Sequence, residues 1–231
     1  MATPASIETL VFNHLSKHWN LKTAKKITGG GITKKNKKMP FYNYDLSAYD
    51  CDKGTQLRKV ANSVCSKCYA TNGNFQYPSV KLSHQYHIES LNNGFNWVLG
   101  MAYQILKTET KFFRFHASGD LQSIDHAKQI INLAKLTPSC KYWIPTRETR
   151  ILKELKELNI LIPKNCVFRV SAPLIDGHLN SKVFKNTSSV ITSAKKAHGK
   201  NICPSLNQGG KCLDCRACWN GKIKNINYLL H

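Results

Sequence analysis

The chain has 231 residues, of which 42% are hydrophobic, so it can bury a core as one domain, or as one domain with a small appendage, and a wholly disordered basic protein is excluded. Lys and Arg number 34 against 13 Asp and Glu, and the net charge of +21 favours a polyanionic partner, nucleic acid first. No run of about 18 apolar residues predicts a membrane span, and the first residues lack a secretory signal, so we expect no membrane association and a cytoplasmic location.

The positive charge is concentrated at the two ends of the chain. Residues 1–40 carry a net charge of +7 and residues 181–231 carry +8, whereas the residues between them carry +6. This distribution favours nucleic-acid contacts that depend on charge rather than on base sequence. The alternative is that the charges only keep the protein in solution, or mark flexible tails.

In chain order, the pattern predicts a helix over 6–18 and then a loop or arm from Leu21 to Met39, which contains three glycines and seven lysines. A strand at 41–46, a long loop over 51–68 and helices near 79–92 and 95–107 follow. After them, strands at 112–117, 141–146, 166–171 and 189–192 alternate with helices at 123–136 and 148–158.

This alternation is typical of βαβ units with a parallel sheet. We therefore predict an α/β fold in three parts: an N-terminal helix and basic arm over 1–40, a partial (β/α) barrel over 41–200, and a cysteine-rich metal-binding tail over 201–231. A partial or complete barrel is favoured over an open sheet.

Two of the expected strands pair an apolar face with a polar one. Arg114, His116 and Ser118 share a face opposite Phe113 and Phe115. In the strand at 166–171, Arg169 and Ser171 lie opposite Cys166, Phe168 and Val170, and the strand at 141–146 is followed by Arg147. These faces predict a polar ligand site inside the barrel, since sites in α/β proteins gather at the carboxyl ends of strands. The alternative is that both are edge strands facing water.

The chain has nine cysteines, an odd number, and seven of them form two clusters, which favours metal or redox chemistry over a disulfide framework. The tail holds Cys203, which is followed by Pro, and then Cys212, Cys215 and Cys218, with two residues between each cysteine and the next. Four thiolates suit Zn²⁺ or a [4Fe–4S] cluster. The tight spacing with a remote Cys-Pro favours the cluster, because zinc knuckles usually come as separated pairs.

The other cluster consists of Cys51, Cys65 and Cys68, in the loop after the first strand. Three thiolates without a fourth leave a cluster iron, or a zinc, with an open position for a ligand. The alternative is a structural zinc completed by His84 or His87. The two remaining cysteines, Cys140 and Cys166, are expected in the core as small apolar side chains.

Several motifs in order resemble the phage gene-product-88 family. They are Cys65-x-x-Cys68-Tyr-Ala, Arg114-Phe-His116-Ala-Ser118-Gly-Asp120, Trp143-x-Pro-Thr-Arg147, Arg169-x-Ser171 and the tail cysteines through Trp219. That family looks like a distant relative of the radical S-adenosylmethionine enzymes, which carry a three-cysteine loop after the first barrel strand. In this chain the first cysteine gap is 13 residues rather than three, and His116 to Asp120 stand where a Gly-Gly-Glu turn is usual.

The resemblance implies an iron–sulfur enzyme that binds S-adenosylmethionine and acts on, or is bound to, nucleic acid in the host cytoplasm. Asp120 would accept from the ligand's ammonium group, and Arg147 or Arg169 would pair with its carboxylate. His116, Ser118 and Ser171 complete the expected cofactor site. The alternative is a non-catalytic nucleic-acid-binding module stabilised by zinc or a cluster. A hydrolase built on His116 and Asp120 is the weakest hypothesis, because two ligands make a poor metal site.

Overall fold

The computed structural model describes residues 6–33, 38–180 and 182–230. Six parallel strands form one sheet in sequence order, each hydrogen-bonded to the next. They are β1 (Tyr42–Tyr44), β2 (Phe112–Phe115), β3 (Lys141–Thr146), β4 (Cys166–Ser171), β5 (Thr187–Ile191) and β6 (Asn225–Leu229). The α/β class and the parallel sheet are therefore confirmed. The sheet is not closed, with β1 and β6 at its two edges, and the curvature of a partial barrel stays a prediction.

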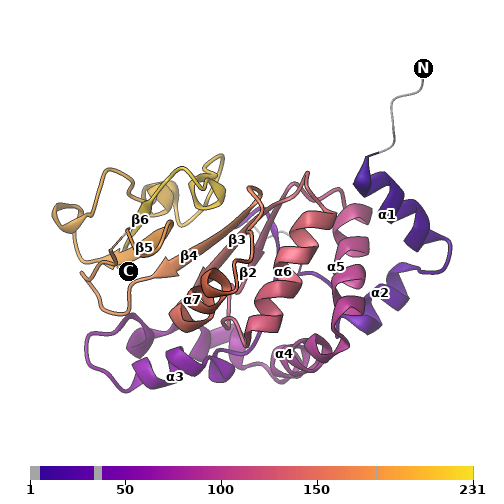
Figure 1. The fold of residues 1–231 in the computed structure, drawn as a ribbon. Helices are drawn as coiled ribbons and strands as arrows, with labels where there is room; N and C mark the ends of the chain where they lie inside the picture. Colours follow the sequence, from indigo (N-terminus) through magenta and orange to yellow (C-terminus); the bar gives the residue numbers. More distant parts are fainter. Residues whose placement is uncertain (1–5, 34–37, 181, 231) are drawn as a thin grey trace.

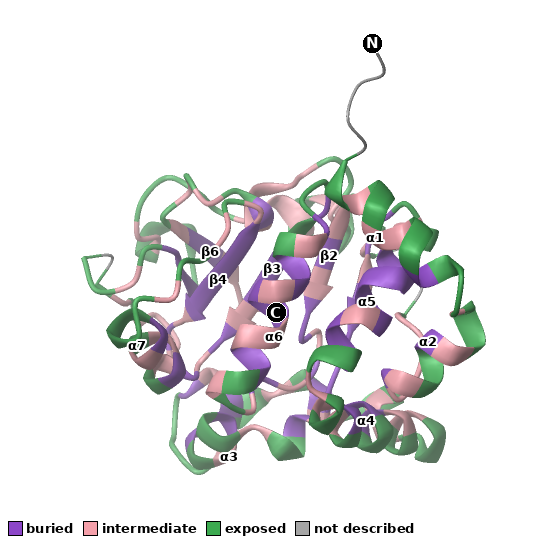
Figure 2. Cartoon of the chain, turned by 45° about the vertical axis from the view of Figure 1, so that its right-hand side comes forward, coloured by how far each residue is buried: buried purple, intermediate pink, exposed green. Residues whose placement is uncertain are grey.

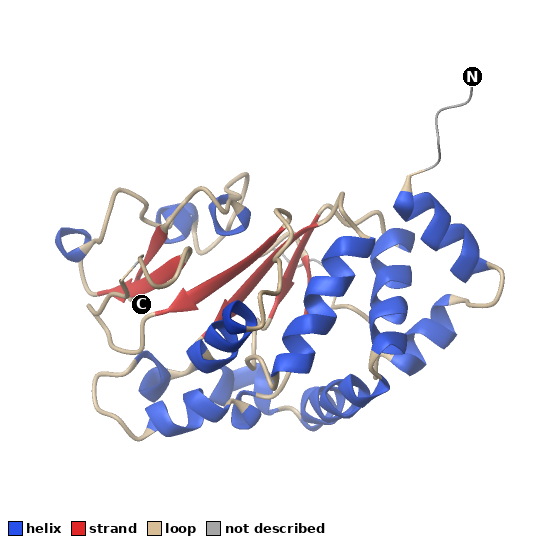
Figure 3. Cartoon of the chain, viewed as in Figure 1, coloured by secondary structure: helices blue, strands red, loops and turns tan. Residues whose placement is uncertain are grey.

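Helices pack against one face of this sheet (Figures 1 and 3). The principal ones are α4 (Pro78–Ser90), α5 (Phe95–Lys107), α6 (Ile124–Leu136) and α7 (Thr149–Glu157), and all four lie close to the predicted ranges. Ser123 starts α6 as an N-cap by accepting from the backbone N–H of His126. The apolar sides of α5, α6 and α7 meet the sheet in the main core, and Figure 2 shows buried and exposed residues on different sides of these helices.

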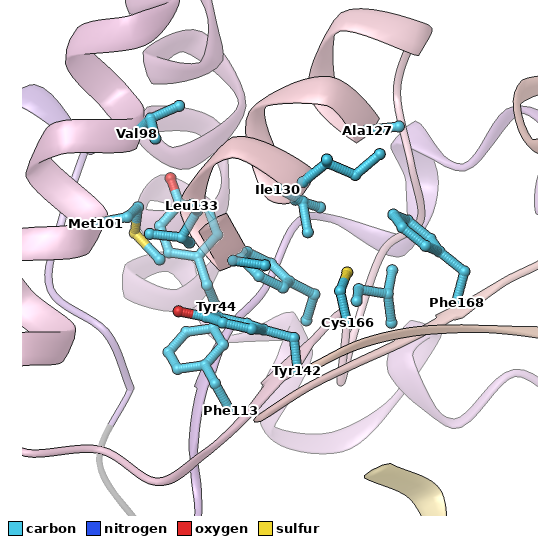
Figure 4. Packing of buried hydrophobic residues seen from close by; sticks show 14 of the residues in the cluster. Tyr44, Val98, Met101, Phe113, Ala127, Ile130, Leu133, Tyr142, Cys166 and Phe168 are labelled. Atoms are coloured by element: carbon cyan, nitrogen blue, oxygen red, sulfur yellow. The ribbon is translucent and has the colours of Figure 1, made fainter. Parts of the chain in front are cut away.

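The core confirms the alternation expected within β2 and β4. Phe113 and Phe115 of β2 are fully buried beneath the helices, beside Tyr142 and the Cys166 and Phe168 side chains of β4 (Figure 4). Cys140 also lies in this core, as predicted for a free thiol. Burial raises the pKa of the Cys140 thiol to about 12, so it stays neutral.

The other face of the sheet is covered by the cysteine-rich tail. Trp219, which is 4% exposed, donates from Nε1 to the carbonyl of Phe113 at 2.8 Å. Its ring packs against Phe41 and Trp143, with ring centroids 4.4 and 5.2 Å away. The tail is thus fixed to the middle of the sheet by a hydrogen bond between residues far apart in the sequence.

Three elements were not predicted. Leu21–Ile27 forms α2, so the prediction of a loop or arm from Leu21 is wrong for these residues, and Asp52–Arg58 forms α3 within the expected long loop. Both helices are only seven residues long, too short for an apolar period to stand out. The third is β6, which comes from the tail and pairs with β5. Residues 34–37 of the expected arm lie outside the described residues.

The first two helices pack on the outside of α5. α1 (Ile7–Ser16) is capped by Ser6, and Leu15 packs with Ala24 and Tyr103. The contact between α2 and α5 depends on Gly100, where a Cβ would lie 2.9 Å from the Thr28 methyl group and 3.2 Å from the Ala24 carbonyl oxygen. Any larger residue would push the helices apart. No helix in the described part of the chain is long and apolar enough to cross a membrane.

Candidate functional site

The three loop cysteines lie together beyond the carboxyl ends of the strands. Cys51 precedes α3, and Cys65 and Cys68 lie in and directly after a short 3₁₀ helix, Val64–Lys67. A Cβ at Gly54 would be 3.6 Å from Cys51 Sγ and 3.9 Å from Cys65 Sγ, so these two sulfurs flank one small space that a side chain would fill. Burial raises the pKa of Cys51 well above the ordinary value, and Asp120, Cys68 and Cys65 raise it further.

Asp120 and Arg147 join this cysteine group. The buried Asp120 carboxylate accepts from the backbone N–H of Leu121 and of Arg147, both at 2.8 Å. Burial raises the pKa of Asp120, while the Thr146 hydroxyl, these two N–H groups and the Arg147 charge lower it. The Arg147 charge lowers the pKa of Cys65, which burial raises more strongly. The buried Nε of Arg147 has no hydrogen-bond partner. We call Cys51, Cys65, Cys68, Asp120 and Arg147 the edge site.

His116 lies in the loop before Asp120 but faces the helices. Its backbone has φ of 58°, which ends the alternation of β2, and its ring centroid lies 5.4 Å from that of His126 on α6. The expected shared face of Arg114, His116 and Ser118 is therefore wrong for His116. The His116 ring lies toward the Pro145 carbonyl, but both of its nitrogens are buried without a hydrogen-bond partner. The buried Ser118 hydroxyl has no hydrogen-bond partner either. Burial lowers the pKa of His116, which keeps the ring neutral.

Arg169 does not join the edge site. It is fully buried and donates to four backbone carbonyls: Thr187 at 3.0 Å, Ile223 at 3.2 Å, and Lys224 and Asn220 at 3.4 Å. Its guanidinium thus holds the chain segment that leads into β6 and lies near Cys218. Ser171 shares a hydrogen bond of 3.1 Å with Ser188 on β5. The structure therefore gives these two residues contacts within the sheet and tail, apart from Asp120.

The four tail cysteines also form one group, which we call the tail site. Burial raises the pKa of Cys212, and the nearby Cys203 and Cys215 raise it further. Burial raises the pKa of Cys218 to about 11, although a 3.3 Å hydrogen bond with the Tyr228 hydroxyl and the Arg169 charge lower it. Mutual repulsion among thiolates would be relieved by a bound cationic group.

Sequence reasoning missed Asp45 as a member of this region. It directly follows β1 and accepts from the backbone N–H of Ala117 at 2.6 Å and of Ser118 at 3.4 Å. Burial raises the pKa of Asp45 to about 6, opposed by the Arg114 charge. Asp45 thus fixes the turn that carries His116 and Ser118 into Asp120. A carboxylate immediately after a strand was the available signal.

Arg114 lies between the two cysteine groups. Its guanidinium carbon is 4.5 Å from the centroid of the Trp143 ring, and it donates to the Tyr69 hydroxyl at 3.4 Å, in the loop that holds Cys68. Its charge also lowers the pKa of Cys212 and Cys218 in the tail. This half-buried cation on the tail-covered face of the sheet therefore lies beside the tail cysteines and contacts the loop that holds Cys68.

The positions of the cysteine side chains can be compared with the ligand set that a single metal ion needs. Within the described residues, no three His, Cys, Asp or Glu side chains converge as the ligands of one metal ion. Zinc needs its thiolates within about 2.3 Å of one point. The cysteines of each group are nevertheless close enough to shift one another's pKa.

An open parallel sheet with helices against one face and the cysteine-rich tail on the other defines the chain as an α/β protein. The model of the family described as Gene product 88 matches residues 15–221, which is most of the chain. The chain therefore belongs to this family of phage gene products, and the resemblance of its motifs is confirmed. Neither the curated proteins nor the solved structures contain a match to it. The relation to radical S-adenosylmethionine enzymes thus stays a hypothesis.

Proposed function

We propose that this chain is an iron–sulfur enzyme that holds a [4Fe–4S] cluster at Cys51, Cys65 and Cys68 and binds S-adenosylmethionine beside it. The observation that carries the proposal is the edge site, in which the thiols of Cys51 and Cys65 flank the space at Gly54, with Cys68, a carboxyl group and a guanidinium nearby. Three protein ligands leave one iron of such a cluster free for a ligand from solution. The same edge of the sheet is where α/β proteins bind their ligands.

Asp120 and Arg147 suit the two charged ends of an amino acid. Leu121, Arg147 and Thr146 occupy three of the roughly four acceptor positions of the Asp120 carboxylate, which leaves one for an ammonium group. The Arg147 guanidinium, with its unpartnered Nε, can pair with a carboxylate in the two-pronged manner of arginine. Arg169, committed to backbone carbonyls, has no part in this ligand site.

A bound cluster would supply a single electron at the iron that also contacts the ligand. The protein's own contribution is to hold the ligand and exclude water. Asp45 and its hydrogen bonds keep the turn before Asp120 in place, and the unpartnered Ser118 hydroxyl and His116 ring are further polar groups of that turn. Burial keeps the Asp120 region dry, which strengthens each charged contact.

The tail site is proposed to hold a second metal group, a [4Fe–4S] cluster with zinc as the alternative. Its four thiols fill all protein positions, so the group would be closed to ligands. The tail also covers one face of the sheet through Trp219, which favours a structural role for the metal. If both metal groups only stabilise the fold, the alternative function applies, and the protein is a non-catalytic nucleic-acid-binding module.

Nucleic acid is proposed as the partner because of the charge of +21. The two basic ends do not lie on one side of the protein: α1 and α2 flank one end of the sheet, and the tail lies at the other (Figure 1). A long strand could meet either end, with an affinity that falls steeply with salt.

The test begins with protein purified and reconstituted without oxygen, followed by iron, sulfide and zinc quantitation. We expect about two clusters per chain, about one in Cys65→Ser, and two in Cys166→Ala, the matched control that changes a thiol in the core. S-adenosylmethionine should then shift the electron paramagnetic signal of the reduced wild type and yield 5′-deoxyadenosine. The Arg147→Gln variant should keep its iron and lose the shift.

A colourless zinc protein would exclude the iron–sulfur proposal. Full iron content without a shift or product on adding S-adenosylmethionine would exclude the enzyme and leave the binding module. Full iron content in Cys65→Ser would remove the edge site as the place of the first cluster.

A further inference from the structure

Exposed aromatic rings flank the edge-site cysteines along the chain, before Cys51 and after Cys68. Tyr49, Tyr69 and Tyr77 are 54, 59 and 58% exposed, and Phe75 is half-buried. Tyr49, Tyr69 and Phe75 come from the short helices Ala48–Asp50, Tyr69–Thr71 and Gly73–Gln76, and Tyr77 lies directly before α4. We call these four rings the aromatic platform. So many exposed rings in one place are costly to keep in water and mark a binding surface.

The protein itself binds the hydroxyl groups of two of these tyrosines. The Tyr69 hydroxyl donates to the Ala117 carbonyl, in the turn before Asp120, and its ring centroid is 5.8 Å from that of Phe75. The Tyr49 hydroxyl donates to the Gln76 side chain at 3.4 Å, next to Tyr77. An exposed tyrosine ordinarily turns its hydroxyl to water. Here two hydroxyls are used internally, so what the platform offers a ligand is ring surface.

Positive charge borders these rings. Between residues 48 and 81 there are five Lys and Arg against two Asp. Arg58 lies with its guanidinium carbon 5.3 Å from the centroid of the Tyr49 ring, held there by the Ala48 carbonyl at 2.8 Å. Lys59 and Lys67 are exposed. Aromatic faces interleaved with cations fit a chain of bases and phosphates.

We infer that the aromatic platform binds single-stranded nucleic acid by stacking unpaired bases on its rings. Every base has an aromatic face, whereas in a duplex those faces are covered by neighbouring base pairs, so the platform can bind only an unpaired strand. Tyr69 joins the platform to both Cys68 and the turn before Asp120, which places a stacked base next to the edge site. The inference rests on the nucleic-acid partner of the proposed function and names its form, but it needs no metal.

The experiment uses the full chain as purified and a fluorescein-labelled thymidylate strand of about 16 nucleotides, compared with an abasic strand of the same length and charge. Fluorescence anisotropy measures both dissociation constants at several salt concentrations. We expect the thymidylate strand to bind about tenfold more tightly than the abasic strand. Tyr49→Ala with Tyr77→Ala should remove that preference and leave binding of the abasic strand, and its salt dependence, unchanged.

Tyr86→Ala is the matched control, because Tyr86 on α4 is 49% exposed and lies outside the platform. Tyr69→Phe keeps the ring and should keep most of the preference. Equal affinity for the two strands, tighter binding to a duplex, or an equal loss in Tyr86→Ala would overturn the inference. Repeating the measurement with Cys65→Ser separates the two proposals: retained base preference with lost iron leaves the platform intact, and lost preference with full iron removes only the platform.

Discussion

The edge site and the tail site use the same side chain in two different settings. In the edge site, three cysteines lie in and beside short helices, next to Asp120 and Arg147, with exposed tyrosines around them. In the tail site, two of the four cysteines, Cys212 and Cys218, pack against Trp143 and Trp219, and the last strand of the sheet follows a few residues later. The number of thiols and what borders them therefore suggest a reactive group at the edge and a structural one in the tail.

The largest effect is expected in the tail. Cys215→Ser should lower the free energy of unfolding by more than about 4 kcal/mol and remove one metal group, because it leaves three thiols around a closed site. Urea unfolding and metal analysis measure both. The control, Cys166→Ala, should lose about 1–2 kcal/mol and no metal. A Cys215→Ser protein with full stability and metal content would contradict the structural role of the tail.

Trp219 connects the tail to the sheet, and its replacement should lower the free energy of unfolding nearly as much as Cys215→Ser does. Trp219→Ala is expected to lower the free energy of unfolding by about 4 kcal/mol, since a buried ring is lost and the Phe113 carbonyl loses its donor. Trp219→Phe keeps part of the packing and should lose less than half of that. Similar values for the two variants would mean that the hydrogen bond, rather than the ring, holds the tail.

Acidic pH should lower the stability of the folded protein through His87. Burial lowers the pKa of His87 to about 4, and its Nδ1 lies 2.8 Å from the Asp45 carbonyl oxygen. The unfolded state binds the proton first, so this stability is present above about pH 6.5 and is lost as the pH falls toward 4, by about 3 kcal/mol. Asp45 opposes this, because its raised pKa of about 6 favours the folded state on acidification.

The His87→Gln variant isolates the His87 contribution. Urea unfolding between pH 7 and 4 should show a smaller loss of stability than in the wild type. Identical pH curves for His87→Gln and the wild type would show that His87 is not held neutral by burial.

The smallest change in stability should come from Gly54→Ala, which nevertheless separates the two sites. The new methyl group would lie 2.8 Å from Cys51 Cβ and fill the space between two sulfurs, while alanine favours α3 by up to about 1 kcal/mol. Because the short contact with Cys51 Cβ outweighs the gain in helix propensity, we expect the free energy of unfolding to fall by about 1–2 kcal/mol, with the edge metal lost and the tail metal kept. Gly221→Ala, where the new methyl group meets only Val167 at 3.6 Å, is the matched control.

The amino-acid sequence by itself determined the local elements and the grouping of cysteines. Helix 95–107 and strands 141–146 and 166–171 lie where the pattern predicts them, because period and end signals are local properties. Cys140 and Cys166 are buried as expected, and the two cysteine groups form. Spacing along the chain was sufficient for these features.

Only the tertiary structure decided which side chains meet. Arg169 and His116 were expected beside Asp120, yet Arg169 is held by carbonyls from the tail, and a positive φ turns His116 toward α6. β6 forms because Asn227, fully buried, gives its side-chain N–H groups to the carbonyls of His198 and Asn201. Such bonds join residues that are distant in sequence and have no periodic signature. These hydrogen bonds exist only once the sheet has assembled, which is why the residues of the edge site could be identified only from the fold.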